Sequence, residues 1–149
     1  MKNILTLAAL ALISFTAVTS CTKTATTTGY SMSVNLGGAP TVFNNSLISV
    51  SNNSVTGAKT YIIEGLYNEK NYPYVYIYLP SKDSGMYTIG NYSMATHAIY
   101  ATDTLTTKQS VSGYVMIDTV TTSFVAGTYS FVCTDGTALT SGQFHAKAL

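Results

Sequence analysis

The sequence predicts an all-β domain, either an antiparallel β-sandwich or a partly closed barrel of roughly eight to ten strands. Three observations support this fold class. Apolar and polar residues alternate with a period of two over much of residues 29–149. Short clusters of Gly, Asn and Asp separate these runs, as turns require. Beyond the first 21 residues, no segment shows apolar residues at helical spacing.

The first half of the predicted domain contains four strand-like runs. Residues 30–36 alternate cleanly and end at Gly37-Gly38. A weaker run around 47–51 does not show which residues face inward. Either Leu47, Ser49 and Ser51 or their neighbours Ile48 and Val50 could form the inner face. Residues 60–67 and 72–79 form a hairpin across the polar loop 68–71. Prolines flank the second of these strands, which favours a position near a sheet edge.

The second half begins with a turn at 81–85 and two short strands at 86–89 and 98–101. Two longer strands follow, and Asp135-Gly136 predicts a type I′ hairpin turn before the last strand. The residues predicted to share one face in each of the last three strands are Val111, Gly113, Val115 and Ile117; Val125, Gly127, Tyr129, Phe131 and Cys133; and Gly142, Phe144, Ala146 and Ala148.

Three glycines recur at matching places in these last strands, at positions 113, 127 and 142. They follow Ser or Ala in Ser-Gly-Tyr, Ala-Gly-Thr-Tyr and Ser-Gly-Gln-Phe. Glycine weakens a strand, so its repetition predicts bulges or tight bends where the sheet curls.

The first residues of the chain predict export. Residues 1–20 contain a lysine followed by the apolar stretch 4–18, which is typical of a signal peptide. The stretch ends in Val18-Thr19-Ser20-Cys21, a lipobox-like sequence in which Cys21 is the lipidated residue. Residues 21–28 would then be the lipidated cysteine and a flexible tether, and residues 29–149 a single domain. An ordinary secretory signal with an incidental cysteine is the alternative.

Composition narrows the class of partner. The 149-residue chain has 46% hydrophobic but only 9% charged residues, against roughly 25% in a typical soluble protein. Its net charge is +1, and removal of residues 1–20 leaves six lysines and six acids. Nucleic-acid binding requires a clustered cationic surface, which the sequence lacks. Neutral ligands are therefore favoured over ionic ones.

The residues that usually carry chemistry are scattered. No two of the six acids form a close pair on one predicted face, and His97 and His145 are far apart. Cys133 falls on an apolar strand face, where cysteine behaves as a small hydrophobic residue. We therefore expect no catalytic residues, no metal site and no cofactor, and we expect both histidines to be ordinary surface residues.

The clearest candidate for ligand binding is the row Tyr74, Tyr76 and Tyr78, which alternates with aliphatic residues. If the aliphatic side chains point inward, the tyrosines stand outside about 6.6–6.8 Å apart. Aromatic faces and phenol groups suit sugar rings and their hydroxyls. The alternative is that these tyrosines only pair across strands as good β-formers.

Two threonines are candidates for O-glycosylation. Asp103-Thr104-Leu105 and Asp118-Thr119-Val120 match the Asp-(Ser/Thr)-aliphatic pattern used for this modification in Bacteroidota. Such short patterns also arise by chance in a chain this rich in threonine.

The segment from Gly85 to Phe144 resembles a family of small Bacteroidota lipoproteins. The resemblance rests on Gly85-Met86-Tyr87, the run 112–117, the run 125–131 and Ser141-Gly142-Gln143-Phe144. It implies a lipid-anchored antiparallel β domain. Its motifs are structural glycines and core aromatics, and the family brings no agreed activity, so it assigns no functional residue here.

Together these features lead us to expect a lipid-anchored β domain of the bacterial cell envelope, held on the outer membrane through Cys21. No acidic run follows Cys21, so the periplasmic and surface faces both stay open. We expect a non-catalytic module that binds a ligand or an envelope protein. The alternatives are a glycan-binding accessory protein that uses the tyrosine row, or a carrier of a small apolar ligand inside the barrel.

Overall fold

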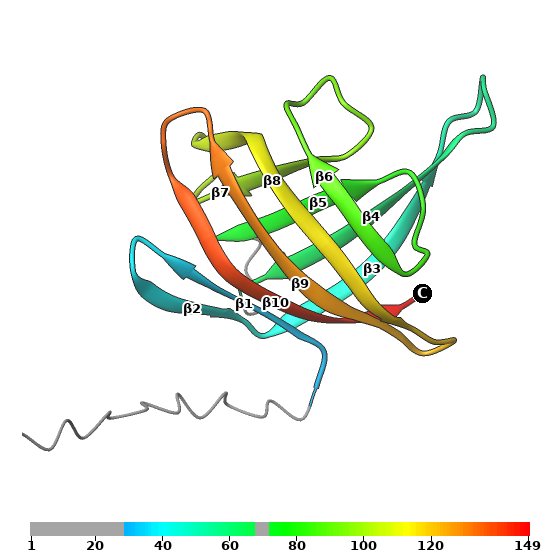
Figure 1. The fold of residues 1–149 in the computed structure, drawn as a ribbon, viewed down its shortest axis with the longest axis horizontal. Helices are drawn as coiled ribbons and strands as arrows, with labels where there is room; N and C mark the ends of the chain where they lie inside the picture. The colour runs from blue at the N-terminus through cyan, green and yellow to red at the C-terminus, as the bar shows by residue number, and fades with distance from the viewer. Residues whose placement is uncertain (1–28, 68–71) are drawn as a thin grey trace, which may run out of the picture.

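The computed structural model describes residues 29–67 and 72–149, which form ten β-strands and no helix (Figure 1). The predicted signal peptide, Cys21 and the tether lie outside the described residues. The strands are β1 (Ser31–Leu36), β2 (Ala39–Phe43), β3 (Asn45–Asn52), β4 (Lys59–Leu66), β5 (Tyr74–Leu79), β6 (Gly85–Ile89), β7 (His97–Ala101), β8 (Thr107–Val120), β9 (Phe124–Cys133) and β10 (Ala138–Ala148). The predicted all-β class is confirmed.

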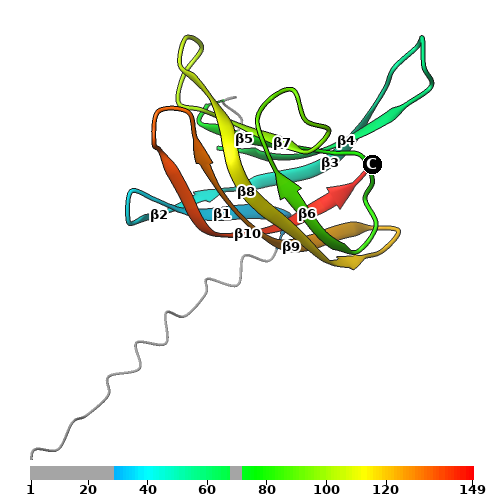
Figure 2. The same ribbon diagram turned by 45° about the horizontal axis from the view of Figure 1, so that its top comes forward.

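Seven of these strands form a closed ring in the order β3, β4, β5, β7, β8, β9 and β10, with β10 returning to β3. The wall formed by β8, β9 and β10 lies across from the wall formed by β3, β4 and β5, as Figures 1 and 2 show. The fold is therefore a barrel with additional strands.

One pair in the ring is parallel, in contrast to the antiparallel arrangement expected from the sequence. It joins β10 to β3 through Lys147–Leu47 and Ala148–Ile48. Strand direction alternates around the other six contacts of the ring. A ring of seven strands cannot alternate throughout, so its closure requires one parallel pair.

Three strands extend from this ring. β1 pairs with β10, and β2 pairs with β1 across a turn in which Gly37 and Gly38 have φ of 58° and 86°. Sequence reasoning missed β2, although its Phe43 is fully buried. β6 pairs with the second half of β8, whose first residues pair with β7.

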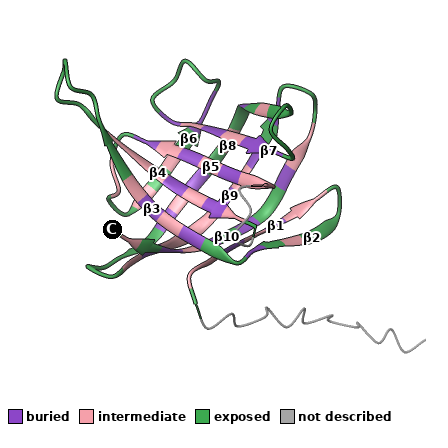
Figure 3. Ribbon diagram, turned by 180° about the vertical axis from the view of Figure 1, so that it is seen from behind, coloured by how far each residue is buried: buried purple, intermediate pink, exposed green. Residues whose placement is uncertain are grey.

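The core consists of the inward-facing residues of the alternating pattern. Figure 3 shows buried and partly exposed residues alternating along β3, β4 and β5. In β3, Ile48 is 4% exposed and faces inward, which settles the choice that the sequence left open. The largest fully buried side chains include Tyr129, Phe43, Phe131, Met32, Ile63 and Ile77.

The repeated glycines lie where an added side chain would clash with a residue of the neighbouring strand, and the predicted bulges are present. A Cβ on Gly127 would overlap the carbonyl oxygen of Met116, and one on Gly142 would lie 2.6 Å from the ring of Tyr129. Gly113 has φ of 152°. Register shifts occur in β8 at 110–112 and 117–119, and in β10 at 139–142. Small residues at these points allow the sheet to curl into a ring.

Two local predictions are wrong. The turn between β9 and β10 is not type I′, because only Gly136 of the Asp135-Gly136 pair has positive φ, at 84°. The Gly136 N–H donates to the Cys133 carbonyl, so Thr134 and Asp135 are the central residues, as in a three-residue hairpin loop that ends in a left-handed glycine. In β8, the bulge at 110–112 places Ser110 inside and leaves Val111 45% exposed.

β5 is also not an edge strand, since it pairs with β4 on one side and β7 on the other. Pro73 and Pro80 lie just outside its ends, where the missing N–H removes no hydrogen bond from the ladder.

Candidate functional site

The outer face of β5 carries the tyrosine row predicted from the sequence. Val75, Ile77 and Leu79 are fully buried in the barrel, so Tyr74, Tyr76 and Tyr78 point outward. All three tyrosines are half-buried. The structure therefore confirms the orientation of the row, while its ability to bind a ligand stays a prediction.

The three rings do not form a flat strip. The centroids of Tyr74 and Tyr76 are 4.4 Å apart with planes at 23°, so these rings stack on each other. Tyr76 and Tyr78 are 6.5 Å apart at 77°, which is close to the strand repeat but turns one ring edge-on. Stacking hides part of each ring and leaves the space between Tyr76 and Tyr78 as the less crowded place on the row.

The row continues into residues that sequence reasoning did not connect with it. Tyr78 stacks on His97 of β7, with centroids 4.4 Å apart and planes at 12°. The loop residue Tyr92 contacts the same imidazole at 4.8 Å, and Tyr72 contacts Tyr74 at 5.3 Å. We call the set Tyr72, Tyr74, Tyr76, Tyr78, His97 and Tyr92 the aromatic ladder.

His97 is thus part of a cluster, although its place in the sequence suggested an ordinary surface residue. Its Nδ1 lies 2.8 Å from the Met94 carbonyl oxygen. A carbonyl only accepts, so Nδ1 donates, and Nε2 of the neutral ring is left as an acceptor. The cross-strand pairing of Tyr78 with His97 brings the two rings together, and no pattern in the local sequence predicts this stacking.

One carboxylate lies beside the ladder. Glu64 of β4 pairs across the strands with Tyr76, and its Oε1 accepts a 2.6 Å hydrogen bond from the Ser49 hydroxyl of β3. Burial, and then the negative charge of Glu64, raises the pKa of the Tyr76 phenol. Burial and the neighbouring Tyr92 phenol raise the pKa of Tyr78. Both phenols therefore stay protonated, and able to donate hydrogen bonds, at neutral pH.

This arrangement combines three kinds of group on one face: partly exposed aromatic rings, phenol hydroxyls and a carboxylate held in place by Ser49. Aromatic faces attract C–H groups and cations, phenols donate and accept hydrogen bonds, and a carboxylate accepts them. Such a face suits a ligand with hydroxyl groups and exposed C–H bonds.

The other titratable residues that the structure describes lie in separate places. Among residues 29–67 and 72–149, no group of three His, Cys, Asp or Glu side chains is placed to hold a metal ion. His145 lies in a separate cluster with Tyr30 and Phe124, at 5.3 and 4.5 Å. Burial raises the pKa of the Cys133 thiol to about 11, which keeps it out of the nucleophilic thiolate form at neutral pH.

Both candidate glycosylation residues are exposed. Thr104 lies in the loop between β7 and β8, where the Asp103 carboxylate accepts hydrogen bonds from the N–H groups of Leu105 and Thr106, at 2.8 and 2.7 Å. These bonds lower the pKa of Asp103. Thr119 lies next to the second bulge of β8. Their modification stays a prediction.

Comparison of the chain with protein families, with curated proteins and with solved structures finds no match. Within the part of the chain that the structure describes, there is no helix with the length and hydropathy needed to cross a membrane.

Proposed function

We propose that this protein is a non-catalytic binding module whose contact surface is the aromatic ladder, and that its ligand is a neutral, hydroxyl-rich molecule such as a glycan. The observation that carries the proposal is the position of the Glu64 carboxylate beside Tyr76, within a run of partly exposed rings from two strands and a loop. Glu64 and His97 Nε2 supply acceptors, and the phenols supply donors.

The remaining chemistry of the chain is consistent with a neutral ligand. Of 149 residues, only 9% are charged, so ionic recognition has few groups to use. The ladder contains no lysine, and Glu64, the acid that lies beside it among the described residues, already accepts a hydrogen bond from Ser49. A sugar hydroxyl can donate to the free lone pairs of that carboxylate while its C–H face packs against Tyr76 or Tyr78.

A glycan array probed with the full-length chain tests this proposal. Tyr76→Ala should weaken binding to the recognised glycan at least tenfold, because it removes the ring between the Tyr74 stack and Tyr78. Tyr114→Ala is the matched control, since Tyr114 is a 41% exposed tyrosine on the outer face of β8. Unchanged affinity of Tyr76→Ala for every glycan on the array would rule the ladder out.

Glu64→Gln sharpens the test, because it retains the shape of the side chain and removes its charge. We expect several-fold weaker binding, since hydrogen bonds to charged groups are stronger than those to neutral ones. Equal affinity of the Gln variant and the wild type would leave Glu64 without a role in recognition.

The envelope location is part of the same proposal. Its support is the sequence Val18-Thr19-Ser20-Cys21 after an apolar stretch, together with the resemblance of residues 85–144 to Bacteroidota lipoproteins. Intact-mass measurement of the native protein should show loss of residues 1–20 and addition of lipid. A Cys21→Ser variant should lack the lipid mass. Additional hexose-containing mass that disappears in Thr104→Ala or Thr119→Ala would establish glycosylation.

The carrier alternative requires space within the ring. Large side chains from opposite walls fill the interior, among them Tyr129, Phe131 and Ile77, each no more than 1% exposed. The outer face of β5 therefore supports binding better than the barrel interior.

A further inference from the structure

A pocket of about 210 Å³ lies at the end of the barrel where β10 finishes. β10 pairs with β3 only at Leu47 and Ile48, whereas β3 and β4 stay paired as far as Asn52 and Lys59. The β3–β4 hairpin therefore extends beyond its neighbour and leaves a recess beside the end of β10. The residues that line the pocket are Ile48, Ser49, Val50, Lys59, Tyr61, Lys82, Ala148 and Leu149.

The pocket has an apolar side and a cationic side. Ile48, Tyr61 and Ala148 supply hydrocarbon surface, and Ile48 is 4% exposed. Lys59 comes from β4 and Lys82 from the loop between β5 and β6. Two of the seven lysines of the chain thus line one small recess, which is notable in a sequence with so few charges.

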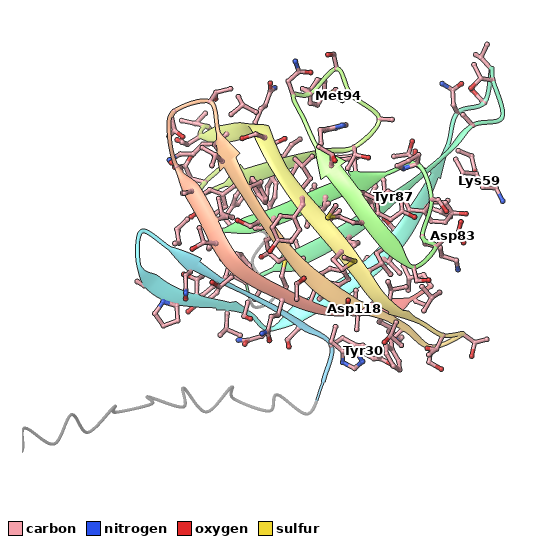
Figure 4. All side chains as sticks on the ribbon, in the orientation of Figure 1. Tyr30, Lys59, Asp83, Tyr87, Met94 and Asp118 are labelled. Carbon is pink, nitrogen blue, oxygen red and sulfur yellow. The ribbon has the colours of Figure 1, made fainter. Side chains whose placement is uncertain are left out.

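Neither lysine is neutralised by an acid in the described part of the chain. The ion pair found there joins Lys108 to Asp135, at the turn between β9 and β10. Asp83 lies at the same end of the barrel as Lys59 (Figure 4), but it does not line the pocket, and its carboxylate accepts a hydrogen bond from the Ser81 hydroxyl. Glu64, whose carboxylate accepts a hydrogen bond from the Ser49 hydroxyl, does not line the pocket.

We propose that this pocket, which we call the lysine pocket, binds a small carboxylate with a short aliphatic chain. The two ammonium groups complement the carboxylate, and the apolar side accepts the hydrocarbon, whose removal from water favours binding. The volume is below the roughly 300–1,000 Å³ typical of pockets for larger ligands, so it suits a molecule of the size of hexanoate. This site does not rest on the glycan proposal, and Ser49, whose hydroxyl donates to Glu64, is the lining residue that the two proposals share.

The experiment follows the isoleucine methyl resonances of the full-length chain by NMR during titration with sodium hexanoate. The Ile48 methyl groups should shift, because Ile48 lines the pocket. The Ile117 methyl groups, buried on the opposite wall, should not shift, and their unchanged position shows that the fold persists. 1-Hexanol, which has the same chain and no charge, should bind at least tenfold more weakly.

Three variants locate the charge effect. Lys59→Gln and Lys82→Gln should each weaken hexanoate binding, and the double variant should weaken it at least tenfold. Lys147→Gln is the matched control, because it removes the same charge from an exposed position that does not line the pocket. Its Kd should stay within twofold of the wild type. An unmoved Ile48 resonance, equal binding of hexanol and hexanoate, or an equal loss in Lys147→Gln would each overturn the proposal.

Discussion

Tyrosines occupy two contrasting environments in this barrel, one inside on β9 and one outside on β5. Tyr129 is fully buried, and its ring lies over Gly142. Its hydroxyl has no hydrogen-bond partner among the described residues. Tyr76 and Tyr78 also alternate with aliphatic neighbours, yet they face outward and contact each other, His97 and Glu64.

The difference shows that alternation determines which residues share one face of a strand. The packing of the neighbouring strands determines whether that face is buried in the core or exposed to solvent. Inside the barrel, Gly142 has no side chain, and the ring of Tyr129 occupies the space beside it. Outside, rings on β5 have no wall to pack against, so they cover one another and stay partly available to a ligand. We expect the inner ring to serve stability, and we propose that the outer rings serve recognition.

The largest expected effect comes from removing the inner ring. Tyr129→Ala should lower the free energy of unfolding by about 3–5 kcal/mol, because truncation of a buried aromatic residue leaves a cavity. Tyr76→Ala, from the outer face, should cost about 1 kcal/mol or less, as is usual for partly exposed positions. Urea unfolding of both variants gives the comparison. Similar decreases in the free energy of unfolding in the two variants would contradict the distinction between the inner and outer tyrosines.

A second test of the difference between the two environments fills the space beside the buried ring of Tyr129. Gly142→Ala places a Cβ 2.6 Å from the buried ring of Tyr129, so either strand or ring must move. We expect a loss of about 1–3 kcal/mol, typical of overpacking. Gly29→Ala is the control, since a Cβ there has nothing within 4 Å. Thermal unfolding should separate the two variants, and equal melting temperatures would show that the ring adapts freely.

Alkaline pH should sharpen the comparison through the phenols themselves. Burial raises the pKa of Tyr129 far above its ordinary value of 10. The unfolded chain therefore loses this proton first, so the contribution of Tyr129 is complete below about pH 10 and falls as the pH rises, by about 1.4 kcal/mol per pH unit at most. Tyr129→Phe should be close to neutral in stability at pH 7, because it removes an unpartnered hydroxyl.

Urea unfolding of the wild type and Tyr129→Phe at pH 9 and above would measure this effect. The wild type should lose stability more steeply with pH than the variant. Parallel curves for the two proteins would mean that the phenol of Tyr129 ionises as readily in the folded state as in the unfolded chain.

The smallest expected effect lies on the surface of the wall that contains Tyr129. The Lys108 ammonium lies 2.8 Å from the Asp135 carboxylate and holds the pKa of Asp135 at about 2. Its stabilising contribution is therefore present above about pH 4, the ordinary pKa of aspartate, and is lost as the pH falls towards 2. Because the pair is exposed, Asp135→Asn should lower the melting temperature only slightly at pH 7.

Most of that difference should be lost near pH 2, where protonation of the wild-type carboxylate removes much of its charge. Differential scanning calorimetry at pH 7 and pH 2 makes the measurement. An undiminished difference at pH 2 would assign the effect to the hydrogen bonds that Asp135 accepts from Thr137 rather than to its charge.

Much of the barrel was predictable from the chain because the signals are local. Alternation in 125–133 placed Tyr129, Phe131 and Cys133 inside, and the repeated glycines marked the places where strands approach closely. The predictions failed where one residue changes the register, as at the bulge that turns Val111 outward. They also failed where proline lies just beyond a strand end, as beside β5.

The sequence by itself determined the all-β class, most strands and the common face of Tyr74, Tyr76 and Tyr78, since successive side chains of a strand point to opposite faces. Only the tertiary structure decided that seven strands close into a ring with one parallel pair. It also decided that His97 and Glu64 join the tyrosines, and that Lys59 and Lys82 share a pocket. These contacts depend on the register between strands and on loops far apart in the chain, which no local pattern encodes.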